Sequence, residues 1–290
     1  MPIKTFSVFS LFFTLCLLSL LAKAKADAVV ELAAPLYPPV YSAGGQGLAS
    51  DILRAAFDEV GVEARIQTVP IKRGVRMLEA GQIDGFGAAS LVAAEIGDRR
   101  ISRLPIFKDR AAWFYYRPNH SGPIVAKGLA SLKGYRIGVI VNSPFLELYR
   151  SHGLDIIEIQ TPQQLIGMVE KGRIDLFEAM MLTGLDLIKQ FDPKHWHQFG
   201  FIPWVPIEGQ IAFLNSNPTT PSLILKLEQG LARIRSNGRL LGILERYWGR
   251  GNVPNHANPQ GLSGANIDSF SLKRFFNAPT ASSGEPVLPR

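Results

Sequence analysis

A ten-residue segment that occurs twice constrains the fold of this chain more than any other feature. Residues 77–86 read MLEAGQIDGF and residues 168–177 read MVEKGRIDLF, and six of the ten positions agree at a constant offset of 91 residues. In both copies the pattern predicts a helix that ends at a glycine, Gly81 or Gly172, where a left-handed residue is needed, followed by a strand. Two copies of one helix-to-strand junction predict two similar structural units.

The similarity continues upstream of both copies. Short strands are predicted at residues 66–69 and 157–160, again 91 residues apart, and earlier helices at residues 51–60 and 145–152. Each unit therefore has the order strand, helix, strand, helix, strand. This βαβαβ order predicts parallel strands with helices on both faces, because parallel neighbours need a crossover connection. The predicted fold class is α/β with two lobes of this kind.

The repeat also places an aspartate at the start of a strand in each lobe, Asp84 and Asp175. Aspartate at such a junction often accepts hydrogen bonds from nearby backbone N–H groups. A role as a ligand-binding carboxylate is the alternative. We interpret both aspartates as structural turn or capping residues.

Two extended segments are expected to connect the lobes. Residues 111–116 read AAWFYY and precede the second lobe, and residues 210–214 read QIAFL and follow it. Two crossings make the second lobe an insertion into the first, and amphipathic helices predicted at residues 221–235 and 240–248 return the chain to the first lobe. Two lobes joined by a two-strand hinge have the geometry of closure around a ligand.

These features define five expected regions of the chain. The last region is rich in Gly, Pro, Ser, Asn and Ala without a sustained period, so we expect it to be mostly disordered, with residues 270–276 as the stretch able to dock as a short element. The expected regions are a signal peptide (1–26), the first part of lobe 1 (27–113), the inserted lobe 2 (114–212), the return to lobe 1 (213–250) and the tail (251–290).

The first 26 residues have the parts of a secretory signal. Lys4 is followed by an apolar run at residues 6–21 and then by small residues near residues 22–26. An uncleaved membrane anchor is the alternative, but a run of about 16 apolar residues is shorter than the roughly 20 that a membrane-spanning helix needs. We therefore expect cleavage near residues 24–26 and a periplasmic location.

Composition excludes several classes of function. Cys16 is the only cysteine and lies inside the predicted signal, so the mature chain would contain no disulfide, thiolate ligand or cysteine nucleophile. Removing the three lysines of the signal lowers the formal net charge from +7 to +4, and basic residues form no dense runs, so we expect no nucleic-acid partner. His195 and His197 lack further nearby ligands, so we expect a surface loop there, and no metal or cofactor.

Seven segments, in this order, resemble the bacterial extracellular solute-binding proteins of family 3, which include receptors for polar amino acids. The resemblance implies a type II periplasmic-binding-protein-like fold whose two lobes close on a small polar solute. It also implies that the protein is a monomer without catalytic activity and delivers the solute to an inner-membrane permease of the ABC type. The segments are LYPPVY (36–41), GLASDILRAAFDEVG (47–61), VPIKRGVRMLEAGQIDG (69–85), DRRISRLPIF (98–107), LASLKGYRIGVIVNS (129–143), MVEKGRID (168–175) and LARIRSNGRLLGILERYWG (231–249).

The resemblance also implies charged ligand-binding residues between the lobes. The family's carboxylate-binding arginine corresponds to Arg99 or Arg100, of which Arg99 has the better context, and a solvated surface arginine is the alternative. Arg73 in PIKRG is expected to face the same cleft. The family's amine-binding aspartate falls at Met180, so the nearest acid is Glu178, which argues against an α-amino acid. We therefore expect an anionic or carboxylate-bearing solute.

Five further residues complete the expected ligand site. Tyr37 corresponds to the aromatic residue that stacks on the ligand, and a core aromatic is the alternative. Ser143 precedes a predicted helix start, where free N–H groups bind anions, although helix capping alone would also explain this serine. The expected set is Tyr37, Tyr41, Ser90, Asn142 and Ser143.

Two rival functions use the same fold. A ligand-sensing module for a membrane receptor would bind the solute in the same way but would have a sensor as its partner. A dehydratase-like enzyme would need a general acid or base in the cleft, for which Glu178 and His152 are the candidates. The residues do not define a catalytic geometry, so we expect a binding protein and not an enzyme.

Overall fold

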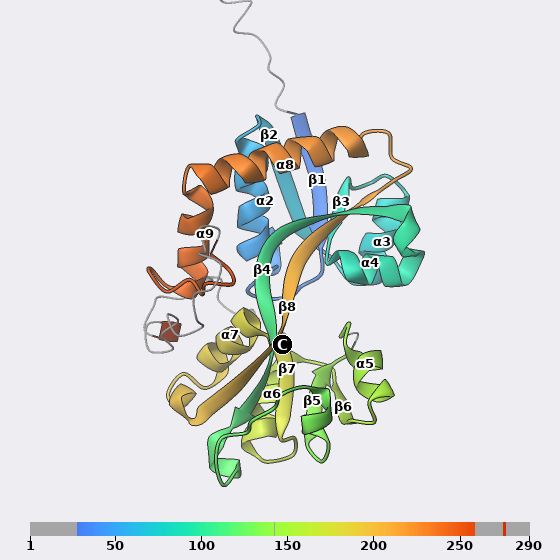
Figure 1. Ribbon diagram of the computed structural model, residues 1–290. Coiled ribbons are helices and arrows are strands. Elements are labelled where there is room, and N and C mark those ends of the chain that lie inside the picture. Colours follow the sequence, from blue (N-terminus) through green and yellow to red (C-terminus); the bar gives the residue numbers. More distant parts are fainter. Residues whose placement is uncertain (1–27, 142, 259–274, 277–290) are drawn as a thin grey trace, which may run out of the picture.

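Two long antiparallel strands, β4 (Ile101–Tyr116) and β8 (Phe199–Leu214), run through both halves of the molecule and connect an upper lobe 1 to a lower lobe 2 (Figure 1). The computed structural model describes residues 28–141, 143–258 and 275–276. The predicted α/β class with two βαβαβ lobes and a two-strand hinge is confirmed. The predicted signal peptide (1–26) lies outside the described residues.

Lobe 1 consists of three parallel strands and five helices. Strand β1 lies between β2 and β3, and β3 pairs antiparallel with β8. The elements of this lobe are β1 (Ala28–Ala34), α2 (Leu48–Asp58), β2 (Val62–Thr68), α3 (Ile71–Glu79), β3 (Gly85–Gly87), α4 (Ala89–Ile96), α8 (Thr220–Ser236) and α9 (Arg239–Trp248), with short 3₁₀ turns at Ala43–Gly45 and Asp98–Arg100.

Lobe 2 repeats this plan. Strand β5 lies between β6 and β7, and β7 pairs antiparallel with β4, so one eight-stranded sheet has the order β2-β1-β3-β8-β4-β7-β5-β6. The elements are β5 (Arg136–Ile140), α5 (Leu146–Ser151), β6 (Asp155–Ile159), α6 (Pro162–Glu170), β7 (Leu176–Met180) and α7 (Met181–Phe191), with 3₁₀ turns at Arg117–Asn119, Leu129–Leu132 and Trp196–Gln198.

The repeated segment forms the same hydrogen bonds in both lobes. An oxygen of the Asp84 carboxylate accepts a hydrogen bond from the Glu31 backbone N–H at 2.9 Å, and Asp175 accepts one from the Arg136 N–H at 2.8 Å. The backbone N–H of each aspartate returns a hydrogen bond to the carbonyl of the same partner. Each aspartate therefore joins the third strand of its lobe to the first, which confirms the structural reading of the repeat.

The hinge strands are much longer than the segments that predicted them. Residues 111–116 and 210–214 are only the ends of the two 16-residue strands β4 and β8. The reason is that prolines interrupt the sequence pattern of a strand, and the register of the pair shifts near Pro105 and near Pro206. The lobe boundaries predicted after residues 113 and 212 fall within these strands.

Buried side chains form a core that is continuous across the lobes on one face of the sheet. In lobe 1 this core includes residues of α2, α8 and α9, and in lobe 2 it includes residues of α6 and α7. A second cluster fills the space between the sheet and α3 and α4, and a third lies beneath α5. Among the described residues no helix combines the length and the hydrophobicity needed to cross a bilayer.

The chain after α9 is described only at residues 249–258 and 275–276, which we call the C-terminal strap. Within it Asn252 and Ala257 are buried, and Phe275 is 2% exposed. The Asn252 side-chain amide donates a hydrogen bond to the Trp248 carbonyl at 2.9 Å. These residues of the predicted tail (251–290) pack against the core, and the rest of the tail lies outside the described residues.

Helices α2 and α8 approach closely at Gly230. A Cβ atom at this position would lie 1.9 Å from the backbone oxygen of Ala56, so α8 would have to move away from α2. We predict that Gly230→Ala lowers the free energy of unfolding by about 2 kcal/mol, as overpacking does elsewhere. Urea unfolding measures this loss.

The matched control is Gly242→Ala in α9, where no atom lies within 4 Å of the new Cβ. Alanine has a higher helix propensity than glycine, so this variant should be as stable as the parent or up to about 1 kcal/mol more stable. Equal stabilities for the two variants would contradict the close packing of α2 on α8.

Candidate functional site

The loop that follows β1 in lobe 1 brings Tyr37 against lobe 2. Tyr37 is half-buried, and its hydroxyl end lies near Thr183 and the Met180 backbone at the start of α7. Burial raises the pKa of the Tyr37 phenol, and the nearby carboxylates of Glu178 and Asp109 raise it further. The Thr183 hydroxyl oxygen is buried without a well-formed hydrogen bond in the described part of the chain. Tyr37 therefore belongs to a polar junction between the lobes.

Glu178 is the acid of lobe 2 at this junction. Strand β7 positions it opposite Trp113 of β4, and only 9% of its surface is exposed. Its carboxylate accepts a hydrogen bond from the Ser143 hydroxyl at 3.0 Å. Burial raises the pKa of Glu178 to about 7, although the hydrogen bond from Ser143 lowers it in part. No Lys, Arg or His of the described residues forms an ion pair with it.

Four aromatic rings pack together in a group that we call the aromatic cluster, and one of them, Trp113, is the cross-strand partner of Glu178. Trp204 of β8 stacks on Trp113 with ring centroids 4.9 Å apart, and it also contacts Phe145 at 5.1 Å and Tyr149 of α5 at 5.8 Å. The Trp113 indole N–H donates a hydrogen bond to the Tyr149 hydroxyl at 3.2 Å. Burial raises the pKa of Tyr149, and the nearby charge of Glu178 raises it further.

Asp109 of β4 is a second buried acid at the junction, and 1% of its surface is exposed. Its carboxylate accepts hydrogen bonds from the backbone N–H groups of Leu182 at 3.2 Å and Arg110 at 2.8 Å, and it lies 3.4 Å from Nε2 of His256 in the C-terminal strap. Burial raises the pKa of Asp109, and these contacts oppose the increase. Asp109 thus connects the hinge, α7 and the C-terminal strap.

The structure brings together three of the residues expected from the sequence: Tyr37, Ser143 and Glu178. Tyr41 is buried in lobe 1, and a Cβ at Gly87 would lie 2.5 Å from its hydroxyl oxygen, so this side chain packs beneath β3. Asn142 lies outside the described residues. The role of each residue in ligand binding stays a prediction.

The other expected residues lie elsewhere on lobe 1. Arg73 in α3, Ser90 in α4 and Arg99 before β4 are all exposed, and within the described part of the chain no contact joins them to the Tyr37–Glu178 junction. Arg100 forms an ion pair with Glu79 at 2.8 Å. Arg99 forms no ion pair among the described residues, so it is the freer of the two arginines.

Sequence reasoning missed Asp109 and the aromatic cluster. Asp109 stands between Lys108 and Arg110, and such a charged triplet is typical of a solvated surface. Trp113 was part of the run that predicted the hinge, but nothing in the sequence pairs it with Trp204, which is 91 residues later. Only the pairing of β4 with β8 brings these rings together.

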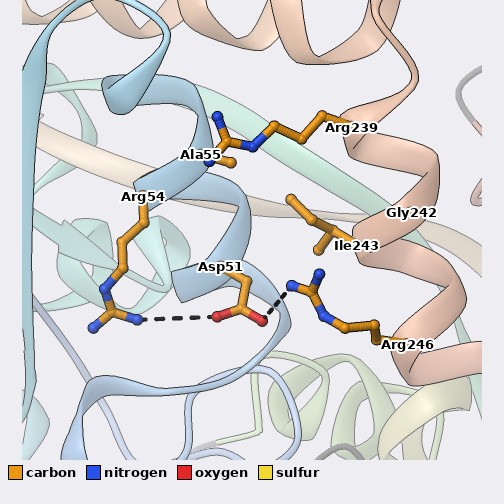
Figure 2. Close-up of a pocket in the computed structure, with 7 residues that line it drawn as sticks. All are labelled: Asp51, Arg54, Ala55, Arg239, Gly242, Ile243 and Arg246. Atoms are coloured by element: carbon orange, nitrogen blue, oxygen red, sulfur yellow. Dashed lines mark hydrogen bonds and ion pairs between the residues drawn. The ribbon is translucent and has the colours of Figure 1, made fainter.

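A separate pocket of about 350 Å³ lies in lobe 1 between α2 and α9 (Figure 2). Figure 2 shows Asp51 between Arg54 and Arg246, and Asp51 accepts hydrogen bonds at 2.9 Å from both Arg246 and the Tyr247 hydroxyl. Arg239 instead binds acids at the end of α2. Because its arginines bind acids within lobe 1, we interpret this pocket as part of the α2–α9 packing. The residues that line it are Asp51, Arg54, Ala55, Arg239, Gly242, Ile243 and Arg246.

Comparison of the sequence with protein-family models and with curated proteins finds no match. Solved structures do match. A histidine kinase sensor domain with similarity to periplasmic binding proteins has a TM-score of 0.60 at 19% identity, over 78% of this chain and 98% of that one. An ancestral arginine-binding protein bound to arginine has a TM-score of 0.59 at 18% identity, over 77% and 99%. The L-cystine solute receptor of Neisseria gonorrhoeae, unliganded and open, has a TM-score of 0.58 at 17% identity, over 79% and 96%.

These similarities show the fold, which is the two-lobed fold of periplasmic binding proteins. The chain covers nearly the whole of each of these structures. The part of this chain that remains unmatched is about a fifth of its length in each case, since 77–79% is covered.

The raised pKa of Glu178 predicts a pH dependence of stability. The folded protein favours the neutral acid, so stability is highest below the ordinary pKa of 4.5 and falls as pH rises to about 7. We predict that Glu178→Gln removes this dependence. The unfolding free energy of the parent relative to the variant should fall by about 3 kcal/mol between pH 4 and pH 8.

Urea unfolding at several pH values measures this difference. Asp186, whose pKa burial raises to about 6, contributes equally in both proteins and cancels from the comparison. Parallel pH profiles for the parent and Glu178→Gln would show that Glu178 is not held neutral in the folded protein.

Proposed function

We propose that the protein is a periplasmic solute-binding protein that closes lobe 2, the inserted residues 114–212, on lobe 1 around a small polar, carboxylate-bearing solute. It would act as a monomer and deliver the solute to an inner-membrane ABC-type permease. The junction of Tyr37 from lobe 1 with Glu178 and Thr183 from lobe 2 carries the proposal. Side chains from both lobes meet there at the hinge, where closure would enclose a ligand.

The two-lobed fold supports binding by closure. Of the strands that the structure describes, β4 and β8 alone run through both lobes, so a small rotation about these strands changes the distance between the facing loops. A solute that contacts both lobes stabilises the closed arrangement, since it binds that state more tightly than the open one.

The carboxylate-bearing part of the proposal rests on Arg73 and Arg99. Both side chains are exposed, and neither forms an ion pair among the described residues. Each guanidinium is therefore available to a ligand carboxylate, which it can bind through two hydrogen bonds. Arg100 already forms an ion pair with Glu79, so it is less available to a ligand carboxylate.

A ligand-sensing module is the second candidate function, and the fold similarity to a histidine kinase sensor domain favours it. Both functions require the same solute site and differ only in the partner. Deleting the gene should abolish uptake of labelled solute if the partner is a permease. It should leave uptake intact and abolish the transcriptional response to the solute if the partner is a sensor.

We predict that a thermal-shift screen over amino acids, organic acids, polyamines and sugars returns a stabilising solute. At a concentration 100 times its Kd the solute should add about 2.7 kcal/mol to the unfolding free energy, or roughly 5–10 °C in Tm for a protein of this size. Mass spectrometry should recover the solute unchanged, as expected for binding without catalysis.

Calorimetry with that solute then tests the arginines. Arg99→Ala or Arg73→Ala should weaken binding by about 2–5 kcal/mol if the arginine forms a desolvated pair with the carboxylate, whereas Arg100→Ala, the matched control, should leave it unchanged. Unchanged affinity in both Arg99→Ala and Arg73→Ala would contradict the proposal that these arginines bind a carboxylate of the solute. A folded protein that no solute stabilises would remove the solute-binding proposal.

A further inference from the structure

The C-terminal strap contacts lobe 1 at the last turn of α9. The Asn252 side-chain amide donates a hydrogen bond to the Trp248 carbonyl at 2.9 Å. The Gly251 backbone N–H donates one to a carboxylate oxygen of Glu245 at 2.8 Å. Farther along the strap, the Phe275 ring lies 6.3 Å from the Trp248 ring. Hydrogen bonds and ring packing therefore hold both described parts of the strap on α9.

The two phenylalanines of the strap also contact lobe 2. The Phe275 carbonyl accepts a hydrogen bond from the Lys189 ammonium of α7 at 3.0 Å, and the same ammonium lies 5.2 Å from the centroid of the Phe275 ring. Burial lowers the pKa of Lys189, as expected for an ammonium that a ring covers. Phe276 stacks on Trp196 with ring centroids 4.6 Å apart and an angle of 10° between the ring planes. The strap thus interacts with lobe 2 through an ammonium and an aromatic ring.

A third contact joins the strap to the hinge. Nε2 of His256 lies 3.4 Å from one carboxylate oxygen of Asp109 in β4, and the His256 ring meets the Trp248 ring edge to face at 6.2 Å. The other oxygen of Asp109 accepts a hydrogen bond from the Leu182 backbone N–H in the first turn of α7 at 3.2 Å. Helix α7 is therefore held at its start by Asp109 and near its end by Phe275.

Rotation of the lobes away from each other would break part of this arrangement. Phe275 is 2% exposed and belongs to the same buried cluster as Trp248 of α9 and Leu185 and Ile188 of α7. If the distance between α9 and α7 increases, Phe275 can keep its contacts with only one of these helices. Opening therefore exposes apolar surface and separates stacked rings, and both changes cost free energy.

We propose that the C-terminal strap acts as an intramolecular restraint on the rotation of lobe 2 relative to lobe 1. The two hinge strands permit this rotation, and the strap adds a connection on the side of the hinge where α7 and α9 lie (Figure 1). The restraint lowers the population of more open arrangements, because they lack the strap contacts. It operates without a solute, so the inference goes beyond the proposed function and does not depend on it.

Spin labels at Arg235→Cys in lobe 1 and Lys171→Cys in lobe 2 measure the orientation of the lobes without a solute. Both native side chains are exposed, and a Cys16→Ser background leaves no other cysteine in the full chain. Phe275→Ala with Phe276→Ala should widen the distribution of distances between the labels, because both rings that contact lobe 2 are removed. An unchanged distribution would overturn the proposal.

A second set of variants tests the stack of Phe276 on Trp196 without altering Phe275. Both side chains are only partly buried, so Phe276→Ala and Trp196→Ala should fold even if Phe275→Ala does not. Each should widen the distance distribution in part. The double variant should widen it no further than either single variant, because all three lose the same contact. Additive effects, or no effect of either substitution, would contradict a restraint that acts through this stack.

Two controls separate a restraint between the lobes from a general loss of structure. Phe191→Ala removes an exposed ring from the end of α7 and should leave the distance distribution unchanged. Labels at Glu147→Cys and Lys171→Cys, which both lie in lobe 2, should give the same distance in every variant. A change in this second distance would show that the strap maintains the fold of lobe 2 itself, and that outcome would also overturn the proposal.

Discussion

The pairing of β4 with β8 is the interaction on which the rest of the structure depends. The two strands are paired from Ile101 with Leu214 at one end to Tyr116 with Phe199 at the other. They are central in the sheet, so β3 adds to β8 on one side and β7 adds to β4 on the other. Each lobe contributes three parallel strands of its own. Backbone hydrogen bonds between β4 and β8 join the strands of the two lobes into one sheet.

That pairing also decides which side chains meet between the lobes. Asp109 and Trp113 lie on β4 near the point where the chain passes from one lobe to the other, and Trp204 reaches Trp113 from β8. Shifts in register near the prolines re-aim side chains locally, as bulges do in other sheets. The same segment therefore serves as the connection between the lobes and as a wall of the candidate site.

The two acids of the junction show how local hydrogen bonding assigns different roles to similar groups. Asp109 receives backbone N–H donors from α7 and β4, so it fixes the position of α7 relative to the hinge. Among the described residues Glu178 receives one hydroxyl donor, Ser143, and burial raises its pKa to about 7. A group in that state responds strongly to a charge brought beside it, which is why we propose Glu178 as a residue of the ligand site.

The sequence by itself determined the architecture, because the repeat at 77–86 and 168–177 encodes local interactions. In each copy a glycine ends a helix, an aspartate accepts backbone hydrogen bonds at the start of a strand, and the order of the elements requires a crossover between parallel strands. It also indicated Tyr37, Ser143 and Glu178, which follow a strand or lie near the end of one. Only the tertiary structure decided that Trp113, Tyr149 and Trp204 pack into one aromatic cluster, and that Phe275 contacts both lobes. These contacts join residues distant in the chain, and they arise from the register of β4 on β8 and from packing, which no local pattern encodes.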